Sequence, residues 1–299
     1  MDTASALQVA STLLLNLGFA WLVGSWFARR WLASGGVDPA AHEVALRRYD
    51  LGAAGLSAGA CAASLWAATA VMAGVPLADA LPSVGMMLTT TDLGRAGCIT
   101  AAAMVGVFLI RLWGRAGRAA GGAALAALAA FAVTRASMGH AGEAGWWNLA
   151  VAAESIHLAA IGLWTGLVAV SGWFVLDKFR LLPIDTAASD KFLHLMSNAA
   201  ILSVAALAGT GIYSAWHRVG SMENLLHSTY GIALLVKLLF VLIALALGGY
   251  NKLVGLPAAS RSRPGIDLVR NVLRIESLVL CVVLLAAAIL TSQQPPTAM

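Results

Sequence analysis

The sequence has 299 residues, of which 60% are hydrophobic and only 11% are charged, and its mean hydropathy is +0.82. Soluble domains carry about 25% charged residues, so this composition excludes a water-soluble globular protein. The net charge of +5 does not indicate nucleic-acid binding, because the basic residues stand between apolar runs, where they act as topology signals.

Eight apolar runs are each long enough to supply the roughly 20 residues that a membrane-spanning helix needs. The sequence therefore predicts an all-α fold, a single integral membrane domain over residues 1–299 that forms a polytopic bundle of about eight spans. The N-terminus lacks the basic region of a cleavable signal peptide, so we expect the first run to be retained as a span. The expected spans are residues 7–27, 51–73, 94–113, 119–137, 147–175, 195–216, 227–249 and 272–291.

The basic residues predict the orientation of this bundle. Of the 19 Lys and Arg residues, all but four lie in or beside the first, third, fifth and seventh connections. Because positive residues accumulate in the cytoplasmic loops of membrane proteins, we expect both termini in the periplasm. The four basic residues outside this pattern are Arg95, Arg135, Arg218 and Lys237.

A short external loop before the fifth span contains Met138 and His140, two positions apart. Thioether groups select Cu(I), and imidazole suits copper in either oxidation state. Each such residue alone would more often be ordinary surface or packing. Together with a histidine in the next span, they predict a site that captures copper at the outer face. Three further external residues of the same two types are weaker candidates: His217, Met222 and His227.

Glu154 and His157 lie inside the fifth predicted span. Their i, i+3 spacing places them on one helix face. A charge near the bilayer centre costs roughly 2.5–3.5 kcal/mol, so an ionisable residue there is a functional candidate by default. The pair predicts an intramembrane copper site. The alternative is a structural pair that holds two helices together.

Three other polar residues in the spans are weaker candidates. Lys237 lies at about the depth of His157, and we expect it to pair with Glu154; alternatively, it repels cations and gates a path. His194 and Asn198 lie near the cytoplasmic end of the sixth span. They are candidates for release of the ion, although packing at the interface explains them equally well.

The remaining chemistry of the chain is sparse. In the eighth span, we interpret Glu276 and Arg274 as a feature of the inner interface whose side chains reach toward water. The sequence has no P-loop, no zinc-protease signature and no Cys-x-x-Cys motif. It therefore does not predict an enzyme, and any transport is expected to run downhill or to be coupled to protons.

The loop Met138–Ala141, the helix segment Glu154–Ala160 and Trp164–Gly166 together resemble the copper resistance protein D family. The resemblance extends from about residue 90 to residue 290, and the first two spans match mainly in hydropathy. Four later segments share the pattern: Gly209–Tyr213, Thr229–Gly231 with Lys237, Tyr250–Lys252 and Arg274–Glu276.

This resemblance implies an eight-span protein of the bacterial inner membrane that takes up copper from the periplasm. It also implies cooperation with a periplasmic copper carrier of the CopC type. The leading hypothesis is a copper transport and homeostasis protein whose partners are the copper ion and the lipid bilayer.

Two alternatives remain open. A haem-binding electron-transfer subunit would need axial histidines at similar depth on different helices, and His157 has no such counterpart. A copper donor or assembly factor would use the same residues without moving the ion across.

Overall fold

The computed structural model describes residues 2–34, 39–114, 117–143, 145–177, 186–293 and 296. Within these ranges the regular elements are helices without a strand, and eight stretches are long and apolar enough to cross a membrane. The predicted all-α bundle and its number of spans are therefore confirmed. The long helices are α1 (Thr3–Ser34), α2 (Pro39–Ala73), α4 (Asp92–Leu112), α5 (Arg118–Ser137), α6 (Leu149–Val170), α8 (Thr186–Val219), α10 (Thr229–Tyr250) and α12 (Arg263–Thr291).

Shorter elements connect or extend these helices. The predicted fifth and seventh spans continue through π-helical turns, η3 after α6 and η4 after α10. The short elements are η1 (Leu77–Ala80), α3 (Leu81–Thr90), η2 (His140–Gly142), η3 (Ser171–Val175), α9 (Met222–His227), η4 (Asn251–Gly255) and α11 (Leu256–Ala259).

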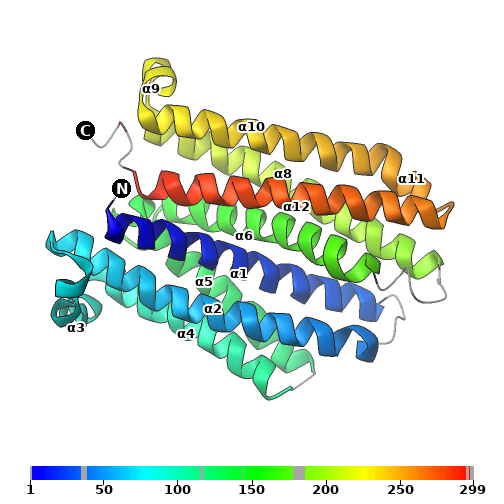
Figure 1. The fold of residues 1–299 in the computed structure, drawn as a ribbon, viewed down its shortest axis with the longest axis horizontal. Helices are drawn as coiled ribbons and strands as arrows, with labels where there is room; N and C mark the ends of the chain where they lie inside the picture. The colour runs from blue at the N-terminus through cyan, green and yellow to red at the C-terminus, as the bar shows by residue number, and fades with distance from the viewer. Residues whose placement is uncertain are drawn as a thin grey trace.

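The long helices run side by side (Figure 1). Helices α1, α6 and α12 form the middle of the bundle, with α2, α4 and α5 on one side and α8 and α10 on the other. Both termini lie at one end, together with α3 and α9 (Figure 1). We call this the terminal end of the bundle.

The shared end of the two termini agrees with an even number of spans, whereas their periplasmic location remains a prediction. Three basic residues that support it, Arg115, Lys178 and Arg180, lie outside the described residues. A phosphatase that is active only in the periplasm is expected to be active when fused to either terminus. A fusion after Ser34, which ends α1, is the matched control and is expected to be inactive. Two inactive terminal fusions would contradict the predicted orientation.

Helices α1 and α6 touch through their backbones. A Cβ atom at Gly166 would overlap the carbonyl oxygen of Ala20, and one at Gly24 would overlap the backbone of Gly166. Small residues allow helices in membranes to approach this closely. The contact fixes α6, the helix that carries Glu154 and His157, against the centre of the bundle.

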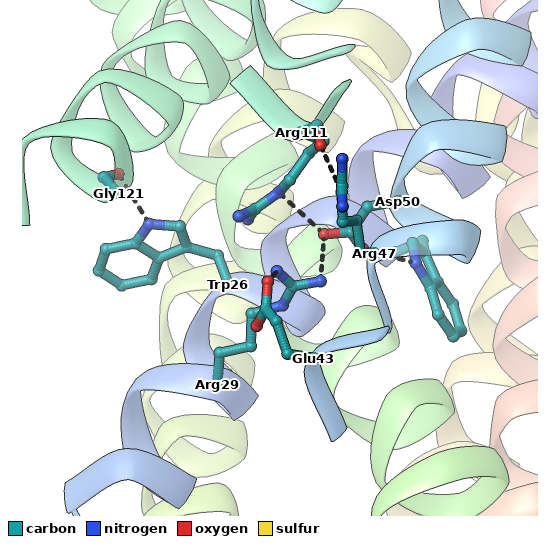
Figure 2. Close-up of polar contacts among 8 residues, drawn as sticks. Trp26, Arg29, Glu43, Arg47, Asp50, Arg111 and Gly121 are labelled. Atoms are coloured by element: carbon teal, nitrogen blue, oxygen red, sulfur yellow. Dashed lines mark hydrogen bonds and ion pairs between the residues drawn. The ribbon is translucent and has the colours of Figure 1, made fainter. Parts of the chain in front are cut away.

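A cluster of charged residues joins three helices at the end opposite the termini (Figure 2). The Asp50 side chain on α2 is fully buried. Its carboxylate lies 2.8 Å from Arg29 Nη2 of α1 and 3.0 Å from Arg111 Nε of α4. It also accepts a hydrogen bond of 3.0 Å from Trp21 Nε1. Glu43 provides a second carboxylate, 2.7 Å from Arg29 Nη1.

Three hydrogen bonds from side chains to backbone carbonyls extend this cluster. Arg47 donates to the carbonyl oxygens of Arg111 and Leu112, at 2.7 and 2.6 Å, and so caps the C-terminal end of α4. Trp26 Nε1 donates to the Gly121 carbonyl of α5 at 2.9 Å. Helices α1, α2, α4 and α5 are thus joined by polar contacts as well as by packing.

The interpretation of Glu276 and Arg274 as a shared interface feature is wrong. Glu276 is 2% exposed, and it accepts a hydrogen bond of 2.9 Å from Trp164 Nε1 of α6. Arg274 instead donates to the Gly172 carbonyl at 2.9 Å and pairs with Asp177 at 2.6 Å. Residues two apart on a helix point in different directions. The Glu276 side chain therefore faces the core, whereas the Arg274 side chain faces Gly172 and Asp177.

Candidate functional site

A cavity of about 500 Å³ lies at the terminal end of the bundle. Its walls come from α1, α2, α5, α6 and the loop between α5 and α6, with single side chains or pairs from α4, α8, α10 and α12. Met138, His140 and Glu154 all line it. The structure therefore brings the two loop candidates together with one residue of the predicted intramembrane pair, whereas His157 does not line this cavity.

His140 is oriented by an acidic neighbour. It begins the turn η2, and its Nδ1 lies 2.7 Å from Glu143 Oε1. A carboxylate on one ring nitrogen fixes the imidazole and leaves the other nitrogen for a metal, an arrangement common among metal-binding histidines. The loop itself is held by Asn148, whose amide donates to the Ala141 carbonyl at 3.0 Å.

Met138 lies at the end of α5, beside a pair of threonines. The Thr100 hydroxyl lies 3.8 Å from the Met138 sulfur, and 2.8 Å from the hydroxyl of Thr134. A thioether sulfur accepts hydrogen bonds only weakly. The contact with Thr100 therefore positions Met138 but leaves its sulfur available to bind a metal ion.

Arg218, rather than Lys237, pairs with Glu154. The Arg218 Nη2 atom of α8 lies 2.7 Å from Glu154 Oε2. Lys237 of α10 lies within electrostatic range of both Glu154 and His157, but it forms no ion pair with Glu154 within 4.0 Å. The predicted Glu154–Lys237 pair is therefore wrong, because the last turn of α8 brings a longer side chain to the same carboxylate.

His157 faces α8, about one turn further along α6 than Glu154. Its Nδ1 lies 2.9 Å from Thr210 Oγ1, and the Thr210 hydroxyl lies 2.7 Å from the Ala206 carbonyl. A hydroxyl has a single proton. In the tautomer with the proton on Nδ1, Thr210 gives its proton to that carbonyl and its oxygen accepts from His157 Nδ1–H, so Nε2 of His157 keeps its lone pair. Glu154 and His157 thus share the face of α6 that meets α8.

The weaker candidates of the external segments stay apart from this cavity. His217, Met222 and His227 are exposed, and none of them lines it. The imidazole of His217 packs on Tyr213, with ring centroids 4.2 Å apart, and its Nδ1 lies 2.9 Å from the Tyr213 carbonyl. These residues do not extend the group formed by Met138 and His140.

His194 and Asn198 are both exposed on α8, toward the other end of the bundle. His194 Nδ1 lies 2.9 Å from the Asp190 carbonyl, one turn earlier in the same helix. In the part of the chain that the structure describes, no three His, Cys, Asp or Glu side chains are grouped so that they could hold a metal ion.

The sequence interpretation missed two arginines at this site. Arg135 and Arg218 both line the cavity, and they are two of the four basic residues that the positive-inside pattern leaves over. Their departure from the positive-inside pattern could have identified them from the sequence. A basic residue on the non-cytoplasmic side or inside a span is costly unless nearby groups stabilise it, so it is a candidate for a site.

Comparison with known proteins finds two family models that match different parts of the chain. Residues 1–149 match the family described as copper resistance protein D-like, N-terminal domain, and residues 190–290 match the family described as copper resistance protein D. The copper transport protein CutJ of Bacillus subtilis (strain 168) is 27% identical over 158 residues, which are 53% of this chain and 28% of the relative. The match thus spans little more than a quarter of that relative's length. No solved structure matches the chain.

Proposed function

Because the chain belongs to the copper resistance protein D family, we propose that it admits copper through the bacterial inner membrane, from the periplasm to the cytoplasm. The observation that carries this proposal is the cavity at the terminal end, which Met138, His140 and Glu154 line together. It joins soft ligands on a loop to a polar residue of a spanning helix. In this proposal the protein is a transporter and catalyses no reaction.

The first step in the proposal is capture at the loop. The thioether of Met138 and the Nε2 nitrogen of His140 are neutral ligands that suit copper, above all Cu(I). The hydrogen bond between His140 and Glu143 supports this role because it orients the ring. A periplasmic carrier of the CopC type would deliver the ion to this loop.

The second step is transfer to His157, whose Nε2 lone pair is available for copper because Nδ1 is bound to Thr210. Glu154 has a different role from the one expected of it, since its charge is already offset by Arg218. We assign it the task of holding that arginine, rather than of binding copper directly. His194 and Asn198 lie toward the other end of the bundle, away from this cavity, and stay candidates for release of the ion.

Replacing both Met138 and His140 with alanine is expected to weaken copper binding about tenfold or more and to slow radiocopper uptake into proteoliposomes. The cause is the loss of both soft ligands at the point of capture. Affinity would be measured on purified protein by competition with a Cu(I) chelator. The matched control replaces Met222 and His227, which are the same residue types, exposed and away from the cavity. Equal affinities in the two double variants would contradict the proposal.

A further inference from the structure

Arg135 is a cationic residue of a membrane-spanning helix without an acidic partner. It lies in the last turn of α5 and lines the cavity at the terminal end. Its Nη2 atom donates to Thr12 Oγ1 at 3.1 Å, and its buried Nε atom has no hydrogen-bond partner. Among the described residues, no carboxylate oxygen lies within 4.0 Å of its guanidinium nitrogens. Arginines with so little solvent are rarely left unpaired.

Glu154, the carboxylate in the inner part of this cavity, lies within electrostatic range of Arg135, but other cations share it. Glu154 is bound to Arg218 at 2.7 Å, so this pair contributes no net charge. Lys237 adds a further positive charge within electrostatic range of Glu154. The inner part of the cavity therefore has an excess of positive charge. Of Arg135, Arg218 and Lys237, Arg135 is the one that lines the cavity without an ion-pair partner.

Two other carboxylates line the cavity, but they lie at its solvent-exposed rim. The side chains of Asp92 and Glu143 are 76% and 71% exposed. Each also has its own partner, Arg95 at 3.6 Å from Asp92 and His140 at 2.7 Å from Glu143. Water screens such exposed charges strongly, so they leave the charge of Arg135 in place.

Part of the remaining lining suits a polar ligand. Next to Arg135, the wall formed by α1 and α2 presents four uncharged polar side chains. They are Gln8, Thr12, Asn16 and Ser64. A volume of about 500 Å³ is large enough for a small organic molecule or a head group, since ligand pockets typically measure about 300–1,000 Å³.

From this geometry we propose that the cavity binds an oxyanion, a carboxylate or phosphate group, and that Arg135 is its principal contact. The planar guanidinium matches the paired oxygens of these groups and binds them through two parallel hydrogen bonds. The unpartnered Nε of Arg135 supplies one donor, and the neighbouring amides and hydroxyls supply others. Such an anion would also lower the repulsion that a copper ion meets beside Arg135 and Arg218.

The test uses three probes on the purified full-length protein in an uncharged detergent or in nanodiscs. Citrate and inorganic phosphate represent soluble oxyanions and are titrated by calorimetry. Phosphatidylglycerol in the nanodisc represents an anionic lipid. Its effect is measured as the rise in the thermal midpoint of the protein relative to nanodiscs of phosphatidylcholine alone. We expect at least one probe to bind or stabilise the wild-type protein, and the responding arm identifies the source of the anion.

Arg135→Gln is expected to weaken that response at least tenfold, or to abolish the lipid-dependent rise in thermal midpoint. Arg95→Gln is the matched control, because Arg95 is exposed at the same end and does not line the cavity; it should respond like the wild type. If Arg135→Gln does not fold, Arg135→Lys keeps the charge and loses the planar fork, and is expected to weaken the response as well. The proposal is overturned if no probe acts on the folded wild type, or if the response is unchanged in the folded Arg135 variant. Copper affinity, measured without these anions, tests the transport proposal separately.

Discussion

Replacing Asp50 with asparagine is expected to lower the free energy of unfolding by about 3–5 kcal/mol, the usual cost of removing one partner from a buried ion pair. The Asp50 side chain is fully buried between Arg29 and Arg111. Asparagine keeps its shape but removes the charge between the two guanidinium groups, so Arg111 loses its carboxylate partner and Arg29 keeps only Glu43. Equilibrium unfolding in mixed micelles measures the change.

Glu43→Gln is the matched control for this prediction. Glu43 binds the same arginine as Asp50, at 2.7 Å from Arg29, but its side chain is 38% exposed. Pairs with an exposed partner contribute little, so we expect a loss below about 1 kcal/mol. If Asp50→Asn were no more harmful than Glu43→Gln, burial would not be the source of the stability of this cluster.

His157→Ala is expected to abolish copper uptake into proteoliposomes while the protein remains folded. In the proposed pathway no other histidine takes the place of its Nε2 nitrogen. Thermal midpoints on the same preparations separate this effect from a loss of stability. Full uptake per folded molecule in His157→Ala would remove the residue from the pathway.

Thr210 offers a finer test of the same site. Thr210→Val removes the hydroxyl that accepts from His157 Nδ1, so the ring loses its fixed orientation. We expect copper affinity at this site to fall about 10–100-fold, as for other residues that orient a metal ligand. Thr210→Ser keeps the hydroxyl and is expected to bind copper like the wild type. A purely structural role of His157 would change stability in these variants without changing affinity.

The number of spans could be predicted from the sequence because hydropathy is summed over about 20 residues and is insensitive to local detail. The ends of the helices could not. Helix α1 continues to Ser34, well beyond the apolar run at 7–27, and α12 begins at Arg263 rather than at residue 272. Arginines at these ends are good helix formers, so the helices continue through them. Such polar extensions have low hydropathy, and a hydropathy window therefore does not include them in the span.

The candidate site was predictable in part. The spacing of Met138 and His140, and the position of Glu154 in a span, indicated residues that the structure places around one cavity. The partner of Glu154 was not predictable, because it depends on the register of α8 and α10 against α6. Local periodicity gives the face of one helix but not the residue opposite it on another. Lys237 was therefore the partner expected from the sequence, and Arg218 was not considered.

The contact between Gly24 and Gly166 restricts where anything can move through this bundle. At that level the backbones of α1 and α6 touch without intervening side chains, so the groove between these two helices is closed to water and to ions. Gly166 lies nine residues beyond His157 on α6, about 14 Å further along the helix axis. In the proposed pathway, the ion would therefore leave the α1 side of α6 and pass along its α8 side, where the imidazole of His157 and the hydroxyl of Thr210 meet.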